Sequence, residues 1–288
     1  MKVELILEGG GMRGIYTCGV LDFFLEKKIV LENVIGVSAG SINALSYISG
    51  QKKRQHDIFI NYSHNKEYIS FSNYLKTGSA FGFDYLFNQL FEKELPFDYQ
   101  AFNNSRSKLL VVITNLKSGE AEYVPIVDLK KQTDYIRASC SLPLISNIVQ
   151  IGEEAYMDGG MADSIPIKSS FERGFNKQIV ILTRSKDYQK GKDKLIGIKK
   201  IKYKDYPNYI ETLSNRSKKY NETLAYINKL EEENRIIVIR PSEPMKIDKF
   251  ETDKEKLEYY YQLGYKDGLA QYQQIKQYLF DCTNAYIK

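Results

Sequence analysis

The sequence predicts an α/β protein with a mostly parallel central sheet, covered by helices in a three-layer α/β/α arrangement. Strand-like and helix-like segments alternate along most of the 288 residues, which is typical of this fold class. A glycine-rich turn follows the first strand-like segment, and a Gly-x-Ser-x-Gly turn ends the second. Hydrophobic residues make up 43% of the chain and charged residues 27%, so it has enough apolar material for a large core.

The elements are predicted in the following order. A strand over 2–8 leads to a helix over 14–27, and a strand over 32–37 leads to a helix that begins at Ser38. Further strands are predicted at 108–114, 122–126, 148–157, 178–183 and 235–240. Later helices are predicted near 168–173, over 207–233 and over 253–280, and apolar residues recur at helical spacing in the second of these.

Residues 65–107 are less regular and are rich in Phe, Tyr, Asn and Ser. We expect short helices and loops there, over one end of the sheet, which could form a lid or a funnel for an acyl chain. We favour the alternative that Phe81, Phe83, Phe87 and Phe91 pack as a helical core stripe. We expect residues 1–288 to form a single domain, because α/β folds of this size often surround one sheet.

Composition narrows the class of protein. No window approaches the roughly 18 uninterrupted apolar residues of a membrane-spanning helix, so we expect a soluble, cytoplasmic protein. The three cysteines, Cys18, Cys140 and Cys282, are far apart and have no histidine near them. This spacing argues against a zinc site and favours a reducing compartment, and we assign these residues no chemistry.

The net charge of +5 is unevenly distributed. Residues 186–204 contain eight lysines and two aspartates, which gives this segment a charge of +6. We favour a solvated basic surface segment, with peripheral contact to an anionic membrane as the alternative. Nucleic-acid binding is not expected, because no recognised binding motif accompanies the lysines. The sequence gives no signal for the oligomeric state.

The first glycine-rich turn, residues 9–14, has the spacing G-x-G-x-x-G of a dinucleotide site, with Glu32 near the expected acidic position. A dinucleotide site gives no reason for the second turn, Gly36-Val37-Ser38-Ala39-Gly40, so we do not favour that reading. This second turn has the pattern of a nucleophile elbow, which projects a serine hydroxyl from a sharp strand-to-helix turn. The pair predicts acyl transfer, because backbone amides of a glycine turn can hold the oxyanion formed when serine attacks an ester.

The order of residues excludes the common catalytic triads. The only histidines, His56 and His64, follow Ser38 closely and lie in a polar, helix-like stretch, so we expect both on the surface. Another group must therefore accept the serine proton. Asp158 is the best-placed carboxylate, because it ends a predicted strand and enters the turn Gly159-Gly160. We favour this role over a plain turn aspartate.

Four ordered motifs resemble the patatin-like phospholipases, specifically their compact bacterial branch. Weaker likeness continues to residue 268, so the resemblance spans nearly the whole chain. The motifs are Gly10-Gly11-Met12-Arg13-Gly14, Gly36-Val37-Ser38-Ala39-Gly40, Ala138-Ser139-Cys140-Ser141-Leu142-Pro143 and Asp158-Gly159-Gly160-Met161-Ala162-Asp163-Ser164-Ile165-Pro166.

The resemblance implies a three-layer fold and a Ser-Asp dyad hydrolase, with Ser38 as nucleophile and Asp158 as its partner. It implies an oxyanion hole at the amides of Gly10 and Gly11, with Arg13 adding positive charge nearby. The expected substrate is a phospholipid or lysophospholipid, cleaved through an acyl-enzyme. The alternatives are an acyltransferase that uses the same dyad and a non-catalytic lipid-binding regulator. No cofactor or metal is expected, and activity should be independent of calcium, because no calcium-type carboxylate loop occurs.

Overall fold

The computed structural model describes residues 2–284, and the side chains of residues 2–280. Within this range, eight strands form one sheet. They are β1 (Val3–Leu7), β2 (Asn33–Val37), β3 (Lys108–Asn115), β4 (Ala121–Ile126), β5 (Val149–Ile151), β6 (Glu154–Asp158), β7 (Lys177–Ile181) and β8 (Ile237–Ile239). The order in the sheet is β5-β6-β3-β2-β1-β7-β8, and β4 also pairs with β3.

Five neighbouring strands, β8-β7-β1-β2-β3, run parallel. The pairs β3–β4, β3–β6 and β5–β6 are antiparallel. The predicted α/β fold with a mostly parallel sheet is therefore confirmed. The single strand predicted at 148–157 is wrong, because the chain reverses at Gly152-Glu153 and forms the β5–β6 hairpin.

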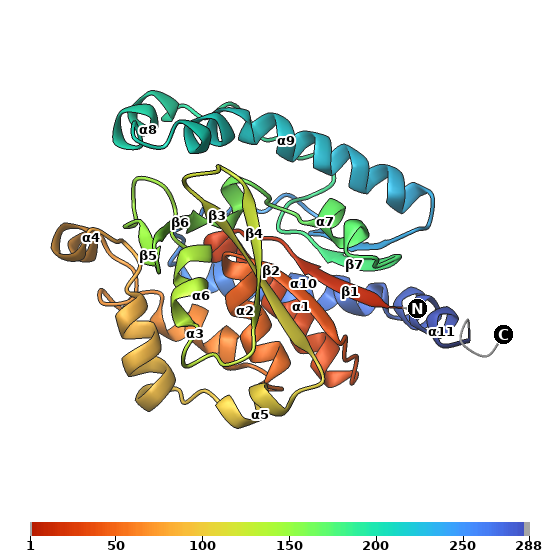
Figure 1. Cartoon of the computed structure of the whole chain (residues 1–288). Helices are drawn as coiled ribbons and strands as arrows, with labels where there is room; N and C mark the ends of the chain where they lie inside the picture. The colour runs from red at the N-terminus through yellow and green to blue at the C-terminus, as the bar shows by residue number, and fades with distance from the viewer. Residues whose placement is uncertain (1, 285–288) are drawn as a thin grey trace.

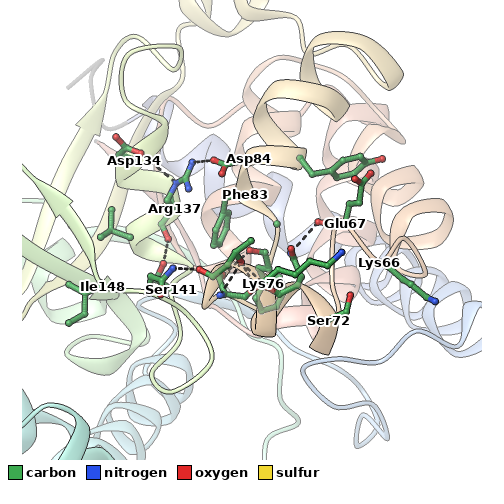
Figure 2. Close-up of a pocket in the computed structure, with 18 of the residues that line it drawn as sticks. Lys66, Glu67, Ser72, Lys76, Phe83, Asp84, Asp134, Arg137, Ser141 and Ile148 are labelled. Atoms are coloured by element: carbon green, nitrogen blue, oxygen red, sulfur yellow. Dashed lines mark hydrogen bonds and ion pairs between the residues drawn. The ribbon is translucent and has the colours of Figure 1, made fainter.

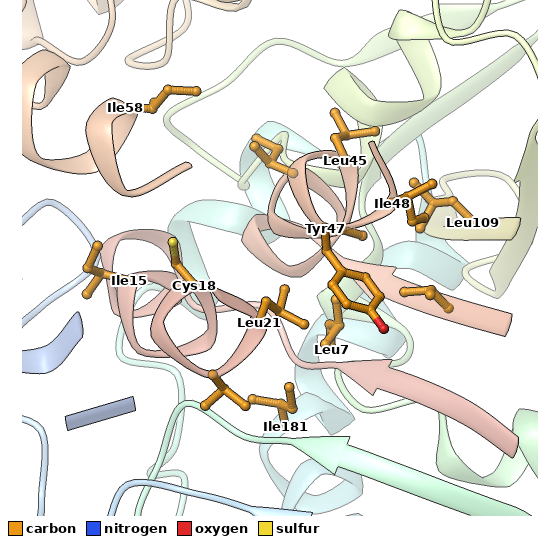
Figure 3. Packing of buried hydrophobic residues seen from close by; sticks show 14 of the residues in the cluster. Leu7, Ile15, Cys18, Leu21, Leu45, Tyr47, Ile48, Ile58, Leu109 and Ile181 are labelled. Atoms are coloured by element: carbon orange, nitrogen blue, oxygen red, sulfur yellow. The ribbon is translucent and has the colours of Figure 1, made fainter. Parts of the chain in front are cut away.

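Alternate residues of the central strands enter two different hydrophobic clusters, because successive side chains of a strand point to opposite faces. Leu5 and Leu7 pack with α1 (Gly14–Glu26), α2 (Ala39–Ile48) and α10 (Lys254–Ala270). Figure 3 shows part of this cluster around Leu7, Leu21 and Tyr47. Ile6 packs on the other face, with α7 (Ile167–Glu172) and α9 (Pro207–Glu232). Figure 1 shows α9 running across its own side of the sheet, which gives the three predicted layers.

Residues 65–107 contain the short helices α4 (Phe71–Thr77) and α5 (Tyr99–Asn104) and the π-helix η2 (Tyr85–Glu94). Phe83, Phe87 and Phe91 are buried in the main cluster, as the core-stripe alternative predicts, whereas Phe81 is only partly buried. Elsewhere the chain forms α3 (Arg54–Tyr62), α6 (Thr133–Ser139), α8 (Ile196–Lys202) and α11 (Tyr272–Asn284), with short 3-10 helices η1 (Gly11–Arg13) and η3 (Gly159–Met161).

Two sequence predictions about helices are corrected. The helix predicted over 253–280 is interrupted at Gln271, where the backbone leaves helical geometry and the side-chain amide donates to the Val238 carbonyl. The segment 186–204, predicted as a loop, contains α8. Most of its lysines are exposed, but Lys199 is buried and pairs with Asp193 at 2.5 Å. Leu195, Ile198 and Ile201 are exposed among these lysines, and contact with a membrane stays a prediction.

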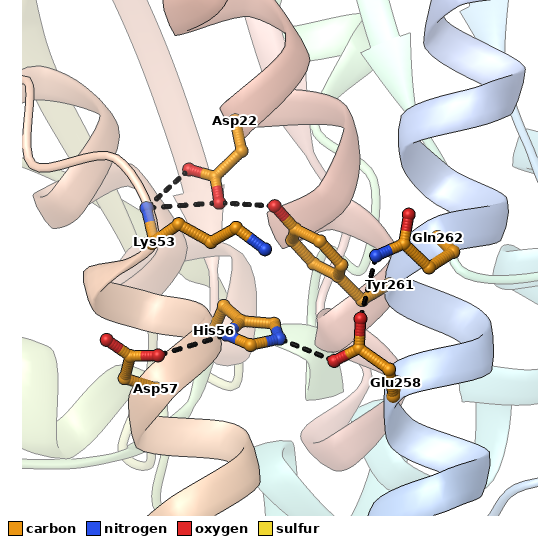
Figure 4. A network of polar contacts seen from close by, with 7 residues as sticks. All are labelled: Asp22, Lys53, His56, Asp57, Glu258, Tyr261 and Gln262. Carbon is orange, nitrogen blue, oxygen red and sulfur yellow. Dashed lines mark hydrogen bonds and ion pairs between the residues drawn. The ribbon is translucent and has the colours of Figure 1, made fainter.

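A polar network ties α10 to α1 and α3 (Figure 4). The Tyr261 hydroxyl on α10 donates to Asp22 on α1 at 2.9 Å. His56 on α3 lies between Asp57 and Glu258, at 3.1 and 2.6 Å. The prediction of a surface His56 is wrong, because its imidazole is only 13% exposed and packs on the Tyr261 ring. His64 is exposed as predicted.

Two further expectations concern single residues and membrane spans. Cys18 and Cys140 are free and buried, as expected for cysteines without assigned chemistry. The side chain of Cys282 lies outside the described residues. Among residues 2–284, no helix has the length and apolar character needed to cross a bilayer.

Candidate active site

Ser38 lies at a sharp turn between β2 and α2. Its backbone has φ 54° and ψ −123°, a conformation that costs a non-glycine residue about 1–3 kcal/mol. Gly40 makes the turn sterically possible, because an added Cβ would lie 2.4 Å from the Leu7 carbonyl oxygen. The Ser38 amide donates to Ser139 Oγ at 2.9 Å, which fixes the elbow from α6. The geometry is that of a nucleophile elbow, as the Gly-x-Ser-x-Gly pattern predicts.

Asp158 lies at the carboxyl end of β6 and is 2% exposed. Its Oδ1 accepts a hydrogen bond from the Gly160 amide at 2.7 Å. Its Oδ2 is buried and accepts no well-formed hydrogen bond from a described protein group, although the Ser38 hydroxyl is near enough to the carboxylate to favour its charged form. Burial raises the pKa of the Asp158 carboxyl, while the positive charge of Arg216, the Ser38 hydroxyl and the Gly160 amide oppose this rise. The structure thus brings Ser38 and Asp158 to one pocket, with Oδ2 of Asp158 available to accept a proton.

The glycine turn after β1 lines the same pocket through Gly10 and Gly11. Gly11 has φ +58°, a conformation that favours glycine, and it leads into η1. Within residues 2–284, the amides of Gly10 and Gly11 donate no hydrogen bond to a protein group. The same holds for the amide of Ala39, the first residue of α2. These donors are free to receive an oxyanion near Ser38.

Arg13, the last residue of η1, is 7% exposed and lines the same pocket. Its Nε has no hydrogen-bond partner among the described groups. Burial and the neighbouring charge of Arg184 lower the pKa of Arg13, while Glu8 opposes this. All the residues predicted for the site, Ser38, Asp158, Gly10, Gly11 and Arg13, therefore meet around one pocket.

Comparison with known proteins identifies the family. A family model described as "Patatin-like phospholipase" matches residues 5–170, more than half of the chain. The chain belongs to the patatin-like phospholipase family. A second model, for a domain of unknown function named DUF6363, matches residues 206–280 of this patatin-like chain.

Similar proteins come from bacteria and a virus. The chain is 29% identical over 190 residues to the uncharacterized protein YjjU of Escherichia coli (strain K12), a match that covers 63% of this chain and 52% of the relative. It is 26% identical over 180 residues to the probable lipid hydrolase 463L of Invertebrate iridescent virus 6, covering 57% of this chain and 61% of that protein. The matches thus span only about half to three fifths of these relatives' lengths.

A solved structure, VipD from Legionella pneumophila, is also similar to this patatin-like chain. The TM-score is 0.44 and the sequence identity 13%, and the match covers 93% of this chain and 66% of that one.

Two further pockets adjoin the site of this patatin-like chain. A narrow one opens beside Ser38 and is lined mainly by apolar side chains, including Met12, Ile42, Phe59, Phe83, Leu86 and Leu142. A larger one, of about 710 Å³, lies between α4, η2, α6 and β5 and contains neither Ser38 nor Asp158 (Figure 2). Phe81, Gly82 and Phe83 line both pockets, so this short segment forms a wall between them.

Four cations that line the Ser38 pocket were missed by the sequence analysis: Arg184, Lys190, Arg216 and Lys249. We call these residues and Arg13 together the basic pocket. Lys190 belongs to the lysine-rich segment that we predicted on the surface, and Arg216 lies on the long helix α9. The chain contains many other basic residues, and no spacing pattern distinguishes these four from the rest.

Proposed function

We propose that this protein is a serine lipid acyl hydrolase that cleaves carboxylic esters of lipids through Ser38 and Asp158. The observation that carries the proposal is the meeting of three features in one pocket. These are a serine at a strained elbow, a buried carboxylate oxygen without a partner, and the free amides of Gly10 and Gly11.

The proposed reaction has two halves. Asp158 Oδ2 accepts the Ser38 proton while Ser38 Oγ forms a bond to the ester carbonyl carbon, and the amides of Gly10 and Gly11 hold the oxyanion. When the carbon–oxygen bond to the alcohol breaks, Asp158 returns this proton to the leaving oxygen and an acyl-enzyme remains. Asp158 then takes a proton from water while the water oxygen forms a bond to the acyl carbon. The bond from that carbon to Ser38 Oγ breaks, the fatty acid leaves, and Asp158 returns the proton to Ser38 Oγ. The raised pKa of Asp158 suits a group that must both accept and donate a proton.

The narrow apolar pocket beside Ser38 supports a site for the acyl chain. Met12, Ile42 and Leu86 are buried there, within reach of a chain whose ester lies at Ser38. The wall at 81–83 separates this pocket from the larger outer one, so residues 65–107 supply both core packing and one side of the proposed acyl site. The two sequence-based alternatives for this segment are therefore compatible.

The experiment compares ester turnover by the wild type with that of Ser38→Ala and Asp158→Asn. We expect each substitution to lower kcat by at least about 10²-fold, because general base assistance is typically worth about 10²–10⁴. Ser72→Ala on α4 is the matched control, since this serine is exposed and lies away from the dyad. Circular dichroism verifies equal folding. Equal turnover by all four proteins would exclude the proposed dyad.

A product assay separates the proposed hydrolase from an acyltransferase. Released fatty acid is quantified with and without an added acceptor alcohol such as glycerol or a lysolipid. Hydrolysis predicts that fatty acid remains the main product in both cases. Accumulation of acylated acceptor, lost in Ser38→Ala, would instead assign acyl transfer to the same dyad, and no turnover of any ester would favour a lipid-binding regulator.

A further inference from the structure

The basic pocket carries more positive charge than catalysis by Ser38 and Asp158 requires. Its five cations face two acidic residues of the lining, Glu8 and Asp158, so the formal charge is 5 − 2 = +3. Within residues 2–284, none of the five cations forms an ion pair. The Glu8 carboxylate is held by hydrogen bonds from Tyr220 and Thr183 and opposes the charge of Arg13 and Lys190, but it is one carboxylate against five cations. The pocket is therefore suited to a strongly anionic ligand.

The cations are held in place by contacts that leave their charged groups without a carboxylate partner. Asn221 on α9 holds the backbone of Lys190 through two hydrogen bonds, and Lys190 Nζ lies over the Tyr220 ring. The carbonyl of Lys249 accepts a hydrogen bond from the Met12 amide, which ties its loop to the glycine turn. Arg216 uses Nε to donate to the Gly160 carbonyl at 2.5 Å. Arg13 Nε has no partner among the described groups although the side chain is more than nine-tenths buried.

The electrostatics agree with this geometry. Burial, with the charge of Arg216, lowers the pKa of Lys190 to about 7. Burial and the charge of Arg216 also lower the pKa of Lys249, to about 8. A bound anion would relieve the repulsion between these positive charges. The lipid whose ester lies at Ser38 is the molecule that would bring such an anion into the pocket. Four of the five cations lie beyond the residues that match the patatin family model: Arg184, Lys190, Arg216 and Lys249.

We propose that the basic pocket binds a phosphomonoester head group, so that the preferred substrate is an acyl glycerol phosphate rather than a phosphocholine lipid or a neutral glyceride. This inference rests on the proposed function and specifies its substrate. A phosphomonoester carries close to two negative charges at neutral pH and three acceptor oxygens, which matches several unpaired cations. A choline head group would instead place an ammonium among five cations, with Glu8 and Asp158 as the only carboxylates of the lining.

The test measures initial rates on three lipids with the same acyl chain, presented in identical detergent micelles. The lipids are 1-acyl-glycerol-3-phosphate, 1-acyl-glycero-3-phosphocholine and monoacylglycerol. We expect kcat/KM for the phosphomonoester to exceed that for phosphocholine by about tenfold or more, as for a charge-assisted hydrogen bond. Lys190→Met and Lys249→Met should each lower this ratio, and Lys249→Arg should retain it. Lys200→Met, an exposed lysine of the same basic segment, is the control and should match the wild type.

Equal rates of the wild type on phosphomonoester and phosphocholine lipids would overturn the inference. If the protein turns over none of these lipids, the proposed function fails. The inference about the head group is then tested separately, by measuring the binding of the non-hydrolysable 1-alkyl-glycerol-3-phosphate by calorimetry. Binding that weakens in Lys249→Met but not in Lys200→Met would support the inference, and absence of binding would overturn it. Inorganic phosphate that binds as tightly as this ether lipid would also overturn it, because the site would then take free phosphate. Melting temperatures verify that each variant is folded.

Discussion

Arg216 contacts the turn that follows Asp158 and lies close enough to affect the charge of that carboxyl. Its Nε donates to the Gly160 carbonyl, and its positive charge opposes the rise in the pKa of Asp158 that burial causes. Arg216 is thus a positioning residue in the proposed mechanism, because it orients the Asp158 turn and tunes its acidity. The base must be deprotonated to accept the Ser38 proton, so activity should fall as the pH drops through the pKa of Asp158.

This relation predicts a shift of the acidic limb of the pH–rate profile. For the wild type, kcat/KM on a soluble neutral ester should fall with a midpoint above 3.8, the ordinary pKa of an aspartate. Arg216→Met removes the opposing charge and should move this limb to higher pH. Lys218→Met is the control, because Lys218 is exposed on the same helix. An unmoved limb in Arg216→Met would show that Arg216 does not tune Asp158.

The residues at the site differ in how far the sequence could reveal them. Ser38 and Asp158 stand in short motifs whose glycines have a local steric purpose, so the sequence alone placed them. Ser139 also stands in one of the four motifs, but its contact with the Ser38 amide shows only in the fold. Glu8 and Arg216 act through partners that are distant in the chain, and their signal is spatial, with no spacing pattern in the sequence.

The helix η2 and the wall before it determine how much room an acyl chain would have. Leu86 is 1% exposed and lines the narrow pocket beside Ser38. Leu86→Phe should fill part of this pocket and lower kcat/KM on long-chain esters by about tenfold relative to short-chain esters. Leu90→Phe on the same helix is the control, because it makes the same change in size at a buried leucine that does not line the pocket. An equal loss of kcat/KM on long-chain and short-chain esters would argue against an acyl site here. So would the same chain-length selectivity in Leu86→Phe and Leu90→Phe.

At the level of elements, the sequence predicted strands and helices where the hydrophobic pattern was continuous. The strands β1, β2, β3, β4 and β7 lie where expected, because each is an apolar run bounded by turn residues. The β5–β6 hairpin was missed although Gly152 marks its turn, because residues 148–157 were predicted as one strand. The break at Gln271 was missed because glutamine is no helix-stop residue. Helix α8 was missed because its lysines mask a short amphipathic repeat.

At the scale of the whole molecule, the segment that follows the patatin match is continuous with the main body. Strand β8 pairs with β7 in the same sheet, and Tyr220, Leu224, Ile227 and Leu230 of α9 share a hydrophobic cluster with β1 and β2. The Tyr16 hydroxyl on α1 donates to Asp267 on α10 at 3.0 Å. We therefore propose that residues 1–288 fold as one cooperative domain.

This proposal predicts one thermal unfolding transition, with loss of ester turnover at the same temperature. Leu224→Ala in the buried face of α9 should lower the free energy of unfolding by about 2–5 kcal/mol and shift the entire transition. Leu195→Ala is the control, because Leu195 is half exposed. Calorimetry that resolves two transitions, with only one moved by Leu224→Ala, would instead indicate separate units.

Two hydrogen bonds attach the loop that carries Lys249 to α10. Asp267 accepts a hydrogen bond from the Ser242 amide, and the Tyr260 hydroxyl accepts one from the Lys246 amide. The stretch between these anchors and α10 supplies no residue to the strands that lead to Ser38 and Asp158, and it touches the glycine turn through the backbone of Lys249. Selection or engineering could therefore retune which lipids are accepted by changing the side chain at this one position, while the backbone contact and the bond-breaking apparatus are inherited intact.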